Sequence, residues 1–408
     1  MNIAAISLTD HDCSLCILKD GEVHENILEE RLSTTKKDGN FFFLSAQLSK
    51  FEQEYGLDKI YIANGNDEDL KLVELYLDKY DINCPVEYIL EEHHLYHASS
   101  AYYSSGFDEA ICLVMDGWGS CHQLIDIFYI LGEVNDDNID DLSSYPEVIF
   151  AETTSVYHAK NNSFRSMYKN YFIPPASNGS YSQSEHIPKK YHSIIAKSSL
   201  VDINPCTDIG IMYGTVTDHL GFSREDGGKT MGLTAYGEED PELPSFMNDT
   251  KLFGNSNLFY HSRLFNWTYH PHLSHDDNFQ KKANIAYKLQ RSIEDAIVLR
   301  VGKILEKYPD TKNLAFSGGV ALNICANSAI KKAYPDLNVF IDPIASDACQ
   351  AYGMAKFYYG KYNKELKNKP LKTIYMGPNY NLKMKRMEIE LAVAKENKRV
   401  YNNMKTRI

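Results

Sequence analysis

MNIAAISLTDHDCSLCILKDGEVHENIL, residues 1–28, opens the chain and sets a pattern that the rest of the sequence repeats. Residues 3–8 and 13–18 are apolar runs of strand length, and the polar turn Thr9-Asp10-His11-Asp12 separates them. A Lys-Asp-Gly turn then leads into a third segment of strand length at residues 23–28. The stretch therefore predicts a sheet built from hairpins.

The same pattern returns near the middle of the chain. A buried strand is expected at residues 110–115, followed by the turn Asp116-Gly117-Trp118-Gly119-Ser120 and a second strand at residues 122–131. The third strand of this set is expected at residues 147–151. Helices that alternate with strands follow each set, so the chain reads as a doubled βββαβα arrangement. This order predicts an α/β protein of two similar lobes that face each other across a cleft.

The elements after each set follow from hydrophobic periodicity. After the first set, helices are expected at residues 42–54, 69–80 and 93–103, and strands at 59–63 and 86–90. After the second set, a long amphipathic helix carries Ile285, Leu289, Ile293, Ile297 and Ile304 on neighbouring faces. It is followed by expected strands at 313–316 and 339–341 and helices at 320–333 and 347–359.

These assignments divide the chain into a first lobe at residues 1–109, a second lobe at 110–378 and a charged C-terminal tail at 379–408 with a helix near 384–398. The polar stretch at residues 161–192 is expected to be a loop inserted in the second lobe. It is interpreted either as a substrate-covering loop or as a surface segment without fixed structure.

Composition limits the classes of function. A chain of 408 residues with 43% hydrophobic content can bury a large core. Its net charge of -13 argues against a protein that mainly grips a nucleic-acid backbone, although a small anionic ligand fits. With neither a signal peptide nor a membrane-spanning stretch in the sequence, we expect a cytoplasmic protein. Cys13 and Cys16 are expected to be buried core residues rather than a redox or zinc pair.

The densest cluster of potential metal ligands is His93-His94-Leu95-Tyr96-His97. On a helix, His93 and His97 would stand one turn apart on one face, which lets two imidazoles reach one metal. The spacing alone fits metal ligands and ordinary histidines equally well. Asp347 is the best candidate for a third ligand, and its alternative role is to cap a helix.

Three glycine-containing segments are candidates for holding phosphate. The turn at Asp116-Gly117 recurs at the position of Asp10-His11-Asp12 in the first half, and glycines let backbone N–H groups approach an anion. Residues 316–323 run from a strand through Gly318-Gly319 into a helix that includes Asn323, which would suit a nucleotide or simply tight packing. Residues 226–237 lack Walker spacing and are interpreted as a mobile active-site loop with Lys229 available to an anion, or as carrying an ordinary solvated lysine.

Taken in order, these motifs resemble the NodU/CmcH-type O-carbamoyltransferases that modify nodulation factors and antibiotics, and the resemblance covers residues 1–378. The matching segments are Thr9-Asp10-His11-Asp12-Cys13-Ser14, Glu29-Glu30-Arg31, His93-His94-Leu95-Tyr96-His97-Ala98, Val114-Met115-Asp116-Gly117-Trp118-Gly119, Gly228-Lys229-Thr230-Met231-Gly232-Leu233, Ser317-Gly318-Gly319-Val320-Ala321-Leu322-Asn323 and Ser346-Asp347. The family's N-terminal domain is similar in fold to the tRNA threonylcarbamoyl transferase and to actin-like (ASKHA) ATPases. The resemblance therefore implies a duplicated actin-like fold.

It also implies a two-step reaction, in which carbamoyl phosphate and ATP give carbamoyl adenylate and the carbamoyl group then passes to a hydroxyl of a sugar, natural product or nucleotide-like acceptor. Carried over residue by residue, the implied metal ligands for iron or zinc are His93, His97 and Asp347. The implied catalytic residues are His11 as the base and Asp12 beside it, and Lys229 of the glycine-rich segment is a third catalytic candidate. The implied nucleotide-binding residues are Asp116, Gly117, Gly318, Gly319 and Asn323.

Two departures from the family pattern affect these expectations. The family continues after residue 378 into a YrdC-like activating domain, which is absent from this sequence. Either a separate YrdC-like protein supplies carbamoyl adenylate, or the sequence is a fragment, or the chain has lost the full activity. Cys349 stands where the family usually has glycine, close to Asp347. The alternatives are a nucleotide-binding or regulatory module without full activity and a tRNA threonylcarbamoyl transferase. No membrane or nucleic-acid partner is expected, and a homodimer is compatible with the resemblance.

Overall fold

The computed structural model describes residues 1–9, 12–63, 65, 67–89, 92–145, 149–173, 191, 199–204, 208–243, 246, 275–363, 366–378 and 398. The chain forms two units, one of Met1–Gly106 with Asp347–Ile408 and one of Phe107–Ser346. Apart from residue 398, the tail at 379–408 and its expected helix lie outside the described residues.

The first unit contains a five-stranded sheet in the order β3-β2-β1-β4-β5. Its strands are β1 (Asn2–Ser7), β2 (Ser14–Lys19), β3 (Glu22–Leu28), β4 (Lys59–Ala63) and β5 (Val86–Ile89). The first three strands are antiparallel neighbours, whereas β4 and β5 continue the sheet in parallel from β1. The hairpin sheet predicted from residues 1–28 is therefore confirmed.

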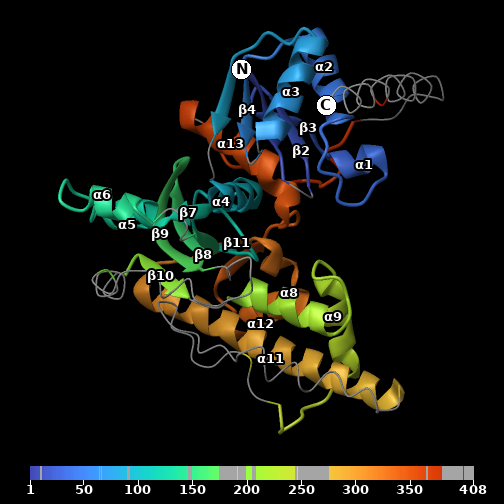
Figure 1. Ribbon diagram of the computed structural model, residues 1–408, viewed down its shortest axis with the longest axis vertical. Coiled ribbons are helices and arrows are strands. Elements are labelled where there is room, and N and C mark those ends of the chain that lie inside the picture. The colour runs from blue at the N-terminus through green and yellow to red at the C-terminus, as the bar shows by residue number, and fades with distance from the viewer. Residues whose placement is uncertain are drawn as a thin grey trace. The chain divides into compact units, whose positions relative to one another are not determined.

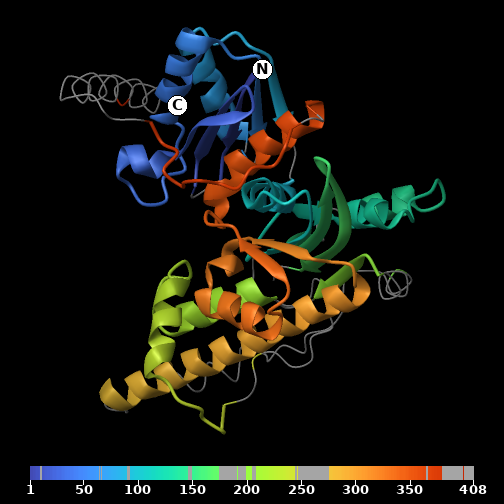
Figure 2. The same ribbon diagram turned by 180° about the vertical axis from the view of Figure 1, so that it is seen from behind.

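Helices cover both faces of this sheet. They are α1 (Glu29–Ser33), α2 (Leu44–Tyr55), α3 (Asp67–Lys79), α4 (His93–Ser105) and α13 (Gln350–Tyr362). Ala4 and Ile6 of β1 point into the core shared with α2 and α3. Figures 1 and 2 show α13 on the opposite face, where Tyr358 stacks on Tyr61 with ring centroids 4.3 Å apart.

The prediction for Cys13 and Cys16 is confirmed, because both residues are fully buried, Cys13 directly before β2 and Cys16 within it. Burial raises the pKa of Cys16 to about 12, since the thiolate form would lose its hydration. A thiol of that kind is a poor nucleophile and a poor metal ligand at neutral pH.

The second unit contains a seven-stranded sheet in the order β10-β9-β8-β6-β11-β12, with β7 paired to β8. Its strands are β6 (Glu109–Met115), β7 (Cys121–Gln123), β8 (Ile149–Lys160), β9 (Ser163–Phe172), β10 (Val201–Asn204), β11 (Asn313–Ser317) and β12 (Asn338–Ile341). Five consecutive strands, β9-β8-β6-β11-β12, repeat the order and the directions of the first sheet. The duplication predicted from the sequence is therefore present in the structure.

The strand expected at residues 122–131 is wrong. Only β7 is extended there, and Leu124–Leu131 forms helix α5, followed by α6 (Ile139–Ser143). A short apolar run has no clear period, so helix and strand are hard to separate from sequence. The deciding signal is a capping box, in which the Gln123 and Asp126 side chains each bond the other's backbone N–H.

The third strand and the loop expected after it also differ from the structure. The strand placed at residues 147–151 is the start of the longer β8, and β9 occupies part of the expected loop at 161–192. Asn161 and Asn162 have φ angles of 51° and 58°, which join β8 to β9 in a two-residue turn. Residues 174–190 lie outside the described residues, so the substrate-covering role is not tested there.

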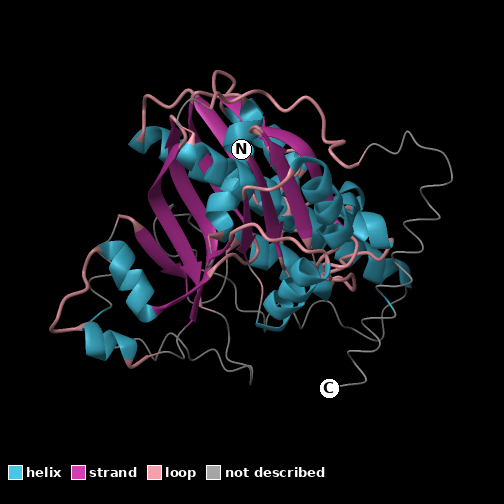
Figure 3. Cartoon of the chain, turned by 90° about the horizontal axis from the view of Figure 1, so that it is seen from above, coloured by secondary structure: helices cyan, strands magenta, loops and turns pink. Residues whose placement is uncertain are grey.

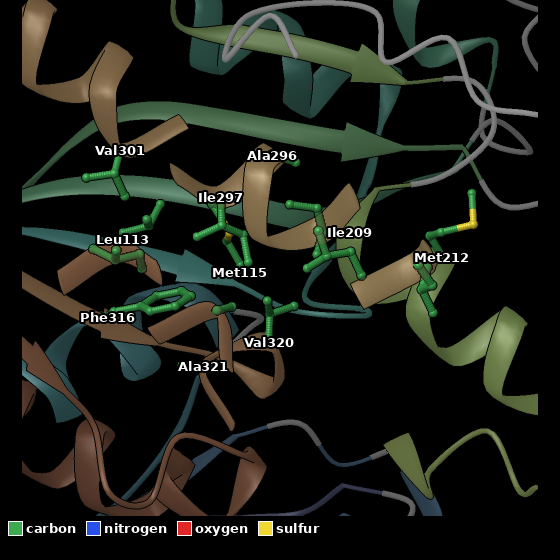
Figure 4. Packing of buried hydrophobic residues seen from close by; sticks show 14 of the residues in the cluster. Leu113, Met115, Ile209, Met212, Ala296, Ile297, Val301, Phe316, Val320 and Ala321 are labelled. Atoms are coloured by element: carbon green, nitrogen blue, oxygen red, sulfur yellow. The ribbon is translucent and has the colours of Figure 1, made fainter. Parts of the chain in front are cut away.

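The second core lies between the seven-stranded sheet and α8 (Ile209–His219), α9 (Gly227–Leu233), α11 (His275–Lys307) and α12 (Ile324–Ala333). Figure 4 shows Leu113 and Met115 of β6 packed among residues of α8 and α11, and Figure 3 shows helices flanking the strands. The predicted stripe of the long helix is confirmed, since Ile285, Leu289, Ile293, Ile297 and Ile304 are all buried.

The mobile loop expected at residues 226–237 is wrong, because this segment forms α9 and the 3-10 turn Thr234–Tyr236. Tertiary contacts outweigh the low helix propensity of its glycines. The Thr230 hydroxyl donates to Thr217 of α8 at 2.9 Å, and Leu233 joins the core.

Residues 347–362 differ from the expected division, since they were placed in the second lobe. The 3-10 turn Asp347–Cys349 and α13 belong to the first unit, where α13 packs on β1, β2 and α4. The order of the elements along the chain is the same whether the last helix packs in the second unit or returns to the first. Sequence order alone therefore cannot show that α13 belongs to the first unit.

Candidate functional site

Helix α4 carries the two histidines of the predicted metal site. All of its residues from His93 to Ser105 are buried, although many are polar. His93 and His97 lie one turn apart, and their Nε2 atoms are 3.1 Å from each other. The helix therefore presents two imidazole nitrogens to one point inside the first unit.

Asp347, the first residue of the second chain segment in this unit, lies next to the two histidines. Its Oδ1 atom is 3.2 Å from Nε2 of His93 and 3.3 Å from Nε2 of His97. The structure thus brings together the three side chains that the resemblance implied as metal ligands. We call these three residues the histidine site.

The spacing of the three donor atoms fits a single cation. Ligand atoms about 2.1 Å from one cation are about 3.0 Å apart in an octahedral site and about 3.4 Å apart in a tetrahedral one. The distances of 3.1, 3.2 and 3.3 Å fall within that interval. Two imidazoles and one carboxylate suit iron or zinc better than magnesium or calcium, which prefer oxygen ligands.

Close packing of α4 against α13 brings Asp347 to the histidines. A Cβ atom at Gly353 would lie 1.9 Å from the carbonyl oxygen of Tyr96, so only glycine fits there. The Ser99 hydroxyl donates to the Gly353 carbonyl at 2.7 Å, and Gln350 Nε2 donates to the His93 carbonyl at 3.3 Å. Sequence reasoning missed Gly353 and Ser99, and the signal available was a buried helix rich in small residues.

The second candidate region lies in the second unit, where β6 and β11 are parallel neighbours and their carboxyl ends meet. The Asp116 carboxylate Oδ1 accepts the N–H of Gly117 at 2.8 Å and the N–H of Gly319 at 3.0 Å. Gly318 has a φ of 91°, and a Cβ there would lie 2.2 Å from the Met115 carbonyl oxygen. We call Asp116-Gly117 and Gly318-Gly319 the glycine turns, and the structure brings them together.

The remaining candidates have other partners in this structure. Asn323 caps α12 by accepting the Ala326 N–H at 3.0 Å, and its amide pairs with Gln290 of α11. Lys229 is exposed on α9 and pairs with Asp226 at 2.7 Å. Their structural roles, a helix cap and a solvated lysine, therefore account for the contacts of both.

The predicted catalytic pair is described only in part. His11 lies outside the described residues. The backbone N–H of Asp12 donates to the Thr9 hydroxyl at 2.8 Å, which fixes the end of this turn just before β2.

Sequence reasoning missed a buried network behind the glycine turns. Asp208 caps α8, forms an ion pair with Arg300 and accepts hydrogen bonds from Thr153, Thr154 and Asn170. Burial opposes its ionisation, yet the guanidinium and these donors hold the pKa of Asp208 at about 2. Because the Asp116 N–H donates to the Thr153 carbonyl at 2.9 Å, the network also supports the turn.

Asp342 was missed as well. It directly follows β12, and its carboxylate accepts the Ser317 hydroxyl at 3.1 Å and the Ile344 N–H at 3.1 Å. A carboxylate at the carboxyl end of a strand in a parallel pair was the signal that could have found it.

Across the part of the chain that the structure describes, no helix is both long enough and apolar enough to cross a membrane.

Comparison with known proteins agrees with the resemblance read from the motifs. The family model "Carbamoyltransferase N-terminus" matches residues 48–356. Uncharacterized protein sll1178 from Synechocystis is 22% identical over 93% of this chain and 61% of its own length. Nodulation protein NolNO from Sinorhizobium fredii is 21% identical over 90% of this chain and 49% of its own length. The chain therefore spans only part of these longer relatives.

More distant similarities show the fold. A tRNA N6-adenosine threonylcarbamoyltransferase from Streptococcus pneumoniae is 25% identical over 41% of this chain and 52% of its own length. HypF from T. kodakarensis superposes with a TM-score of 0.51 at 15% identity, over 88% of this chain and 48% of HypF. Together with the model match, these findings show that the chain belongs to the carbamoyltransferase family, matches its N-terminal part and has a duplicated actin-like α/β fold.

Proposed function

We propose that this chain is the carbamoyl-transferring part of an O-carbamoyltransferase. It would move a carbamoyl group from carbamoyl adenylate to a hydroxyl of a sugar, natural product or nucleotide-like acceptor. The observation that carries the proposal is the histidine site, whose donor atoms have the spacing of ligands to one cation in a chain of this family. Family membership supports the group transferred, and the acceptor class rests on the resemblance alone.

The histidine site would hold the cation through Nε2 of His93, Nε2 of His97 and Oδ1 of Asp347. A divalent metal bound there supplies a Lewis acid that polarises a carbonyl or phosphoryl oxygen. The two imidazoles are buried and fixed in one helix, so they would meet the cation without first losing side-chain freedom. The Asp347 carboxylate would offset part of the cation's charge.

The glycine turns would bind the nucleotide part of the adenylate. Their N–H groups at Gly117 and Gly319 are held by the Asp116 carboxylate, which occupies the position that an anionic oxygen would otherwise take. A phosphate beside this carboxylate needs a positive charge nearby, because two close anions repel each other. Lys229 would offer one such charge if it exchanged Asp226 for the ligand.

Removal of the acceptor's proton needs a base. His11 would take the proton from the attacking hydroxyl, with Asp12 beside it in the turn before β2. A neutral imidazole suits this role because its ordinary pKa lies near the working pH.

Reconstitution tests the proposal. The chain would be mixed with a separate YrdC-like protein, carbamoyl phosphate, ATP and a panel of hydroxyl compounds, and products would be detected by mass spectrometry. We expect an acceptor to gain one carbamoyl group in the wild type, with the gain lost in His93→Ala. His158→Ala is the matched control, since His158 pairs with Glu109 at the edge of the second unit. Equal product with His93→Ala would refute the metal-dependent mechanism.

A second candidate is threonylcarbamoyl transfer to tRNA, which the Streptococcus pneumoniae relative favours. The net charge of -13 opposes it, because tRNA binding relies on Lys and Arg. Incubation with threonylcarbamoyl adenylate and tRNA separates the two functions. Modified tRNA would establish this candidate, whereas nucleotide binding without transfer to tRNA or to any hydroxyl would indicate a regulatory module.

A further inference from the structure

Cys349 contacts the histidine site at Nδ1 of His97, the ring nitrogen that does not face His93 and Asp347. It lies in the turn Asp347–Cys349, and its Sγ atom is 3.1 Å from Nδ1 of His97. Both side chains are fully buried, with relative exposures of 0%. The contact is therefore shielded from water, which cannot replace the sulfur as a partner of this nitrogen.

We propose that Cys349 is a positioning residue of the metal site: its sulfur accepts the Nδ1–H of His97 and so directs the Nε2 lone pair of that ring toward the cation. This role rests on the proposed metal site. It extends that site from three ligands to the residue that orients one of them.

The chemistry of imidazole links the two nitrogens. A neutral ring carries one N–H, so a proton held at Nδ1 leaves Nε2 with a free lone pair. Nε2 of His97 is the atom that lies 3.1 Å from Nε2 of His93 and 3.3 Å from Asp347. Metal-binding histidines usually donate their other N–H to a fixed acceptor, which sets the tautomer and the ring orientation.

The local backbone accepts cysteine without strain. Cys349 has φ -86° and ψ -9°, in the right-handed region that any residue can adopt. Replacement of the family's usual glycine therefore leaves the loop geometry intact and adds a side chain that reaches His97.

Cys349 does not act as a ligand itself. In the described residues, the potential ligand atoms that lie within 4.8 Å of one another include those of His93, His97 and Asp347 but no cysteine sulfur. The sulfur meets the ring at Nδ1, whereas the other two ligands meet it at Nε2. The position fits an orienting contact and does not fit coordination.

The test is the affinity of the purified chain for Co²⁺, measured by competition with a chromogenic chelator. Cys349→Ala removes the acceptor, and we expect Co²⁺ to bind about 10- to 100-fold more weakly. Cys349→Ser keeps an acceptor at the same place and should restore most of the affinity. Cys16→Ala is the matched control, because it empties an equally buried thiol position in the same unit and should leave the affinity unchanged.

Thermal unfolding of the metal-free variants separates positioning from stability. Both alanine variants should lose similar stability, so a loss of affinity confined to Cys349→Ala reports on the site. Wild-type affinity in Cys349→Ala, or no rescue by serine, would overturn the role of Cys349 alone. A wild-type chain that binds no Co²⁺ would overturn the metal site of the proposed function, and this role with it.

Discussion

The histidine site and the glycine turns use the same sheet topology in different ways. In the first unit, side chains from α4 and from the turn before α13 supply the chemistry, and the sheet only supports the helices. In the second unit, the ends of β6 and β11 supply backbone N–H groups directly. The first unit therefore offers side chains suited to a cation, whereas the second offers backbone N–H groups suited to the phosphates of a nucleotide, and we expect mutations in one unit to act mainly on its own ligand.

The largest effect is expected in the buried network of Asp208 and Arg300 that supports the glycine turns, and it is an effect on the free energy of unfolding. Asp208→Asn leaves the buried Arg300 charge without its carboxylate, which should cost about 3–5 kcal/mol of unfolding free energy. Chemical denaturation monitored by fluorescence measures this loss. Co²⁺ affinity of the folded protein should stay unchanged, and a parallel loss of Co²⁺ affinity would show that the two regions are not independent.

The contribution of the Asp208 carboxylate to the free energy of unfolding should depend on pH. Its pKa in the folded state, about 2, lies below its ordinary value of 3.8, so its contribution is complete above about pH 4 and is lost as the pH falls toward 2. The shift corresponds to about 2 kcal/mol. The stability gap between wild type and Asp208→Asn should therefore narrow over this interval, and a gap that stays constant with pH would contradict the assignment.

The reverse experiment disrupts the histidine site without changing a ligand. Gly353→Ala forces α13 away from Tyr96 and should cost about 1–3 kcal/mol, as overpacked cores do. Because Asp347 moves with α13, Co²⁺ binding should weaken strongly, while adenine-nucleotide binding measured by calorimetry should persist. Unchanged Co²⁺ affinity would mean that the close approach of the two helices does not position Asp347.

A smaller effect is expected at the glycine turns themselves. Gly318→Ala places a methyl group against the Met115 carbonyl at a positive φ, and the folded chain should lose about 1–2 kcal/mol of stability together with nucleotide affinity. Isothermal titration with an adenine nucleotide would show the change. Gly232→Ala on α9 is the control, since a Cβ there meets no atom within 4 Å.

The smallest effect is expected at Lys229. Its exposed pair with Asp226 should contribute less than about 1 kcal/mol, so Lys229→Ala should leave stability almost unchanged. If carbamoyl transfer nevertheless fell markedly in that variant, Lys229 would have the anion-binding role expected from its glycine-rich segment.

Much of the framework could be predicted from sequence because its signals are local. The apolar runs of β1, β2 and β6 and the stripe of α11 were located within a few residues. The errors have two causes. In α5 an apolar run that suits a strand competes with a helix capping box, and in α9 tertiary packing makes a glycine-rich segment helical.

The candidate site could be predicted only in part for a related reason. The spacing of His93 and His97 can be read from one helix. The approach of Asp347 to them depends on Gly353, which has no side chain and lies about 250 residues from the histidine helix in the sequence. The contact between Cys349 and His97 has the same long-range origin. Long-range packing of this kind leaves no periodic trace in the sequence.

The central claim is that His93, His97 and Asp347 hold one cation. Its most direct test is the stoichiometry of Co²⁺ or Zn²⁺ bound by the purified chain, determined by titration and elemental analysis. We expect one equivalent of metal in the wild type and in the control His158→Ala, and loss of that equivalent in Asp347→Ala as well as in His97→Ala. One equivalent bound with undiminished affinity by Asp347→Ala would contradict it.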